Sequence, residues 1–90
     1  MYAIEYTEEA REDIAKLRHS EPLCFKKVRK LFLELMEHPK EGTGHPEPLK
    51  AGNSITWSRR ISKKHRLVYE VHETEVVVLV LAAYGHYDDK

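Results

Sequence analysis

The feature that most constrains the fold is an unbroken apolar run over residues 76–83. The run reads V-V-V-L-V-L-A-A and follows a turn signal at Glu73-Thr74. A continuous apolar run of this length is typical of a strand that is buried on both faces. We therefore expect a central strand over residues 76–83, with the rest of the chain arranged around it.

The segments before this run predict a strand and two helices. Alternating apolar residues indicate a short strand over residues 2–6. Thr7 suits a helix N-cap because two glutamates follow it, where the helix dipole favours acids, and this helix should reach about Arg18. A three-four repeat of apolar residues predicts a second helix from Ser20 to Pro39 with a wide buried face.

Two further strands, over residues 55–61 and 66–72, should form a hairpin around a turn. Ile55, Trp57 and Ile61 would share one face, and Thr56, Ser58 and Arg60 the other. If the apolar sets of both strands share a face, Arg60 comes to lie beside Arg66. Like charges opposite one another cost stability. The two arginines are therefore either kept for an anion or are ordinary surface residues.

These elements predict an α+β fold, in which two N-terminal helices pack on a small antiparallel sheet in the order β-α-α-β-β-β. Ninety residues suit one domain, residues 1–90. The hydrophobic fraction of 41% and charged fraction of 33% exclude a disordered chain. A polar N-terminus, a single cysteine and no apolar run of membrane length predict a cytoplasmic protein without signal peptide, disulfide or membrane partner.

Positive charge is concentrated in residues 40–66. This segment holds seven Lys and Arg against two acids, a net charge of +5 in a chain whose net charge is zero. Such a segment suggests an anionic partner, most often phosphate. Residues 40–54 are rich in Gly and Pro, which predicts an irregular loop. Within it, Glu47 stands between two prolines that limit its conformations. Glu47 is either a rigidly placed acid–base group or a solvated acid on a stiff connection.

The predicted central strand leads to His86, which can exchange a proton near neutral pH. No pair of histidines has the spacing of a helical metal site, so we expect neither a metal nor another cofactor. The cluster of Lys and Arg over residues 26–30 suits a solvated helix face, and it could also contact nucleic acid.

Four motifs in order, G-H-P-E-P-L-K, W-S-R-R-I, H-R-L-V-Y and a closing H-Y, resemble the YoeB toxins of the RelE/ParE-like superfamily. The resemblance covers nearly the whole chain, as far as Tyr87. It implies a toxin of a type II toxin–antitoxin system that cleaves mRNA on the ribosome without a metal. The implied partners are a cognate YefM-like antitoxin and the bacterial ribosome with its mRNA. The sequence leaves open whether the free chain is a monomer or a homodimer.

The resemblance also implies the site. The family's catalytic residues match Glu47, Arg66 and His86. Its supporting residues match Lys50, Arg60 and Tyr87, and the same basic segment supplies Lys63 and Lys64 for binding RNA phosphate. Two other functions remain open: a gyrase-binding toxin without catalysis, and a ribosome- or RNA-binding module. Neither would need the three catalytic residues together.

Overall fold

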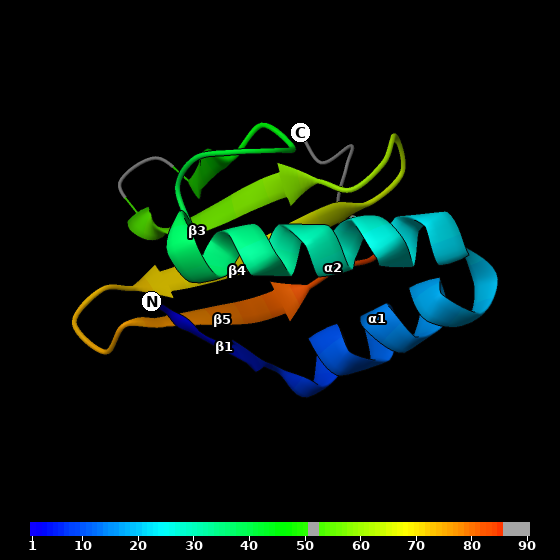
Figure 1. Ribbon diagram of the computed structural model, residues 1–90, viewed down its shortest axis with the longest axis horizontal. Coiled ribbons are helices and arrows are strands. Elements are labelled where there is room, and N and C mark those ends of the chain that lie inside the picture. Colours follow the sequence, from blue (N-terminus) through cyan, green and yellow to red (C-terminus); the bar gives the residue numbers. More distant parts are fainter. Residues whose placement is uncertain (51–52, 86–90) are drawn as a thin grey trace.

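The computed structural model describes residues 1–50 and 53–85, with the backbone alone for residues 50, 53 and 54. Two helices lie against one face of a five-stranded sheet (Figure 1). The elements in chain order are β1 (Ala3–Tyr6), α1 (Glu8–Ser20), α2 (Pro22–Glu37), β2 (Glu47–Lys50), β3 (Asn53–Arg60), β4 (Arg66–His72) and β5 (Val77–Ala82). The strand order is β1-β5-β4-β3-β2.

The predicted fold class is confirmed, and the sheet is mixed. β1 runs parallel to β5, while the other three strand pairs are antiparallel. The parallel pair arises because α1 and α2 carry the chain from β1 at one edge of the sheet to β2 at the other. The antiparallel strands β2 to β5 then return across the sheet and place β5 beside β1.

The strand β2 was not expected, since residues 40–54 read as an irregular loop. Residues 47–50 instead pair with β3 at the edge of the sheet. A proline lacks the N–H that a central strand needs, so the P-E-P sequence argued against a strand. An edge strand tolerates Pro48, because one side of β2 has no neighbouring strand among the described residues.

The strand β5 is an interior strand as predicted, with β1 and β4 on its two sides. Burial on both faces was wrong. Val78 and Val80 are buried on the helix-covered face, whereas Val77, Leu79 and Leu81 are half-buried on the other. The reason is that the helices cover only one face of the sheet.

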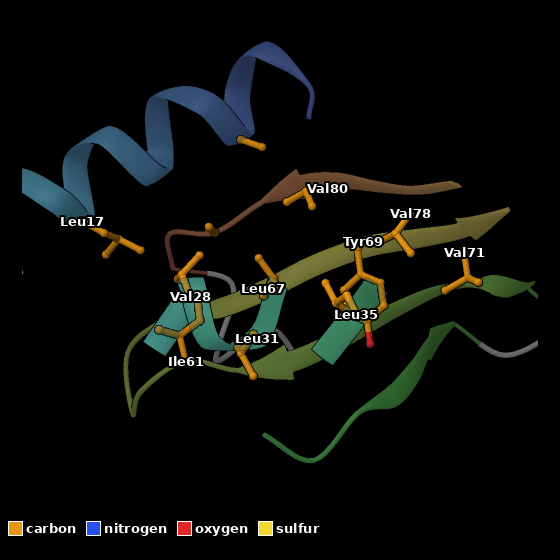
Figure 2. Close-up of a cluster of buried hydrophobic side chains, with 12 residues drawn as sticks. Leu17, Val28, Leu31, Leu35, Ile61, Leu67, Tyr69, Val71, Val78 and Val80 are labelled. Carbon is orange, nitrogen blue, oxygen red and sulfur yellow. The ribbon is translucent and has the colours of Figure 1, made fainter. Parts of the chain in front are cut away.

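The core lies between α2 and the sheet (Figure 2). Val28, Leu31 and Leu35 of α2 are fully buried against Tyr69 and other residues of β4 and β5. α2 is thus the main packing partner, as its apolar repeat predicted. In the described part of the chain, neither helix has the length and apolar character that crossing a membrane requires.

The helix boundaries follow from local chemistry. Thr7 caps α1 as predicted, because its side-chain oxygen accepts a hydrogen bond from the Ala10 N–H at 3.1 Å. The same hydroxyl donates to the Leu81 carbonyl oxygen at 3.1 Å and so ties α1 to β5. α2 begins at Pro22, two residues later than predicted, with Glu21 in the N-cap position.

Candidate active site

An arginine pair lies on the face of the sheet that no described helix covers. Arg60 of β3 is directly opposite Arg66 of β4, which is the register that the sequence predicted. Leu67 and Tyr69 point into the core, so residues of the other parity in β4 point to the open face. Two cationic side chains therefore start from neighbouring positions on this face.

Glu47 joins the same face through β2. It is directly opposite Ser58 of β3, which is in turn opposite Val68 of β4. Directly opposed residues of antiparallel strands point to the same side. Ser58 is 1% exposed and Val68 is 8% exposed, while Glu47 and Arg60 are exposed and Arg66 is half-buried. Ser58 and Val68 thus form a buried floor, and the charged side chains surround it.

The separation of these residues suits a substrate between them. Glu47 and Arg66 stand two strands apart, which corresponds to about 10 Å across the sheet. Long Glu and Arg side chains can close such a gap from opposite sides onto a phosphodiester. The arrangement thus offers an acid–base group on one side of an anion and cationic donors on the other.

The approach to Glu47 is held by Arg59, whose burial the sequence analysis missed. Arg59 is 0% exposed and points toward α2. Its guanidinium donates to the Glu34 carboxylate at 2.7 Å and to the Tyr69 hydroxyl at 3.2 Å. It also donates to three backbone carbonyl oxygens, those of His38, Glu41 and Thr43. One buried side chain thus fixes the loop that leads into β2.

Glu34 completes this Arg59 cluster, which we define as Arg59, Glu34, Tyr69 and the loop 38–43. The Thr43 backbone N–H donates to Glu34 Oε1 at 2.8 Å, and the Thr43 hydroxyl donates to Oε2 at 2.6 Å. Burial favours a raised pKa for Glu34, but the bonds from Thr43 and Arg59 outweigh it and lower that pKa. Burial also raises the pKa of Tyr69.

Gly44 lets the loop lie against β3 next to the arginine pair. Its φ is +86°, and a Cβ built on it would lie 2.8 Å from the Arg60 carbonyl oxygen. The Gly44 carbonyl oxygen accepts from the Arg60 N–H at 2.7 Å. Glycine is required here by both the backbone conformation and the close contact.

A second group of contacts holds the segment after β5. The Ala83 N–H donates to the buried Asp13 carboxylate at 2.9 Å, and the Gly85 N–H donates to His65 Nδ1 at 2.9 Å. The Gly85 carbonyl oxygen accepts from the Arg66 N–H at 2.9 Å. Neither Asp13 nor His65 was predicted from the sequence to make these contacts. Their partners lie 70 and 20 residues away, and no local periodicity marks such contacts.

The remaining predicted site residues stand as follows. Lys63 and Lys64 are exposed in the turn between β3 and β4, close in the chain to the arginine pair. His86, Tyr87 and the side chain of Lys50 lie outside the described residues. Among residues 1–50 and 53–85, no group of three or more His, Cys, Asp or Glu side chains could hold a metal ion.

Comparison with protein families gives a match over most of the chain. The family model for the YoeB-like toxin of bacterial type II toxin–antitoxin systems matches residues 6–87. The chain is 39% identical over 82 residues to Toxin YoeB of Escherichia coli strain K12, which covers 91% of this chain and 95% of the relative.

Solved structures give the same answer. A YoeB/ParE toxin from Agrobacterium tumefaciens is 29% identical with a TM-score of 0.86, over 94% of this chain and 99% of the other. A YoeB dimer from Staphylococcus aureus is 30% identical with a TM-score of 0.83, over 96% and 98%. A YoeB–YefM complex from the same organism is 30% identical with a TM-score of 0.80, over 97% and 99%.

The fold is therefore that of a small toxin of the RelE/ParE-like kind. The chain belongs to the YoeB-like toxin family of bacterial type II toxin–antitoxin systems. Membership of this family supports a general endoribonuclease role.

Proposed function

We propose that this chain cleaves mRNA on the ribosome without a metal, using Glu47, Arg66 and His86. The observation that carries the proposal is the shared open face, on which Glu47 and the Arg60–Arg66 pair flank a floor of small side chains. The YoeB family match supports a ribonuclease role for that face.

The reaction divides among the three residues. Glu47 removes the proton of the 2′-hydroxyl, and the freed oxygen attacks the adjacent phosphorus. Arg66 and Arg60 stabilise the extra negative charge of the pentacoordinate phosphorus. His86 donates a proton to the 5′-oxygen as the phosphorus–oxygen bond breaks. The products are a 2′,3′-cyclic phosphate and a 5′-hydroxyl, so atoms and protons balance.

Substrate binding uses the surrounding basic residues. We assign RNA phosphate contacts to Lys50, Arg60, Lys63 and Lys64, and a supporting contact to Tyr87. The net charge of +5 in residues 40–66 supports this assignment, because phosphate neutralisation supplies much of the affinity for RNA.

A need for the ribosome follows from how open the site is. Glu47 and Arg60 are exposed, so water competes for both in the free protein. A ribosome that holds mRNA across this face would exclude water and align the 2′-hydroxyl with its phosphorus. The free protein is then a poor nuclease.

The proposed partner is a YefM-like antitoxin, and the proposed assembly of the free toxin is a homodimer. Relatives from Staphylococcus aureus have been solved as a YoeB–YefM complex and as a YoeB dimer. An acidic, partly disordered antitoxin that folds over the basic face would block substrate access. Protection of the lysines of residues 50–64 from chemical modification in the complex would support this mode.

The test is cleavage of a defined mRNA in a reconstituted translation system. Glu47→Gln, Arg66→Ala and His86→Ala should each slow cleavage by about 10²–10⁴-fold, the range typical of an acid–base group. His72→Gln is the matched control, because His72 lies at the far end of β4 and should leave the rate unchanged. Wild-type rates in all three folded variants would refute the assignment.

A further inference from the structure

His65 is a buried histidine whose two ring nitrogens both have partners. It is 2% exposed and directly precedes β4. Nδ1 accepts the hydrogen bond from the Gly85 N–H at 2.9 Å, so this nitrogen carries no proton. Nε2 must therefore carry the ring proton, which it donates to Glu21 Oε2 at 2.9 Å. The contacts fix a neutral ring in one tautomer.

The residues that surround the His65 ring come from three parts of the chain. Glu21 stands at the start of α2, and its hydrogen bond from His65 lowers its pKa, with a smaller effect from Lys64 at 3.7 Å. The Tyr84 ring lies 4.3 Å from the His65 ring, and the Lys16 ammonium lies 4.4 Å from the Tyr84 ring centre. α1, α2 and the chain after β5 thus meet around His65.

Gly85 is held at both of its backbone polar groups. Its N–H donates to His65, and its carbonyl oxygen accepts from the Arg66 N–H. Its φ of +73° lies in the left-handed region, which glycine adopts without strain. Gly85 directly precedes His86 in the sequence. The backbone that leads to the proposed acid is therefore tied to the residue proposed to stabilise the phosphorane.

We propose that His65 is a positioning residue that anchors Gly85 and thereby presents His86 to the RNA. The inference rests on the proposed function, because it gives His65 a role only if His86 is the acid. His65 itself takes no proton from the substrate. The Glu21 contact holds the ring so that Nδ1 faces the Gly85 N–H.

Two substitutions separate this role from simple structural support. Asn at position 65 places its Oδ1 near the position of Nδ1 and can still accept from Gly85. Gln at position 65 reaches the position of Nε2 and can still donate to Glu21, but offers nothing to Gly85. A purely structural role favours Gln, which is larger and keeps the link to α2. The positioning role favours Asn.

The measurement is steady-state cleavage of mRNA on translating ribosomes, which gives kcat and KM. We expect His65→Gln to lower kcat by about 10²-fold with KM little changed, the size typical of a misplaced catalytic group. His65→Asn should stay within about tenfold of wild type. Equal losses, or a more active Gln variant, would overturn the proposal. His72→Gln is again the matched control. The Nε2 atom of His72 contacts Glu70 Oε1 at 2.8 Å, and both residues lie away from the site.

Two further readouts make failure interpretable. In the free protein, hydrogen exchange of the Gly85 N–H should speed up in His65→Gln and stay slow in His65→Asn. The double variant His65→Gln/His86→Ala should be no slower than His86→Ala alone, because both substitutions disable the same proton donor. Additive losses in rate would overturn the positioning role of His65 and leave the proposed function standing. A wild-type rate for His86→Ala would instead overturn the acid assignment in the proposed function.

Discussion

Arg59 and His65 do comparable jobs at opposite ends of α2. Arg59 reaches Glu34 in the C-terminal half of the helix and holds the loop 38–43 before β2. His65 reaches Glu21 at the helix start and holds Gly85 after β5. Each therefore fixes one backbone segment that leads to a candidate catalytic residue, Glu47 in one case and His86 in the other.

The two differ in how much depends on each side chain. Arg59 is a fully buried cation with five hydrogen bonds, three of them to backbone carbonyl oxygens. His65 is neutral and holds one backbone N–H. Losing a buried charge leaves several groups unsatisfied at once, whereas losing His65 leaves far fewer. The Arg59 cluster should therefore govern stability, and His65 should govern the rate.

The largest expected effect is that of Arg59→Leu. Removing the fully buried guanidinium leaves the half-buried Glu34 carboxylate and three backbone carbonyl oxygens without their donor, so we expect a loss of about 3–5 kcal/mol in the free energy of unfolding. Urea unfolding measures it. Arg60→Ala, an exposed neighbour, should cost no more than about 0.5 kcal/mol. An equally small loss of stability for Arg59→Leu would contradict the view that the Arg59 cluster governs stability.

The next effect is that of Glu34→Gln, which keeps the shape and removes the charge. Hydrogen bonds to charged groups support a loss of about 2–3 kcal/mol at neutral pH. Because the folded protein lowers the pKa of Glu34, its contribution is present above the unfolded pKa, about 4.3, and is lost as pH falls through the lower folded pKa.

The difference between wild type and Glu34→Gln should therefore shrink in acid. Urea unfolding tests this when it is measured at a series of pH values that starts about one unit above 4.3 and continues below it. Glu37→Gln serves as the control, because Glu37 is exposed on the same helix and should leave the pH dependence unchanged. A constant difference across this range would show that the charge of Glu34 is not what Arg59 needs.

The smallest expected losses of stability are those of alanine substitutions at Gly85, next to His65, and at Gly44, next to the Arg59 cluster. Gly85→Ala should cost about 1 kcal/mol, because its φ is +73° and no atom of the described residues lies within 4 Å of an added Cβ. Gly44→Ala should cost about 2 kcal/mol, because the same strain is joined by the contact with the Arg60 carbonyl oxygen. Thermal unfolding of both variants checks the order, and the reverse order would contradict it.

Much of the fold and half of the site could be predicted from the sequence. The Arg60–Arg66 register followed from strand alternation, because a hairpin is local and its period is fixed. The burial of Arg59 had a signal that went unused, since it falls between Trp57 and Ile61 on the inward face. Burial of an arginine is rare without a partner, and Glu34 is 25 residues away in sequence.

Other features had no usable local signal. The prolines beside Glu47 argued against the strand β2 because edge position is a property of the whole sheet, not of the segment. The roles of His65 and Asp13 depend on where the chain after β5 passes. Such contacts between distant segments are decided by the packing of both helices on one face of the sheet.

The parallel pairing of β1 with β5 has a consequence for the timing of synthesis. β5 is the last strand in the sequence, and the Thr7 contact with Leu81 closes a separation of 74 residues. Contacts so far apart form late, and a chain emerging from the ribosome has no β5 with which to pair β1. The sheet therefore stays unfinished during synthesis until residues 77–82 have been added. The anchor at Gly85 forms only after that point, because Gly85 follows β5 in the sequence.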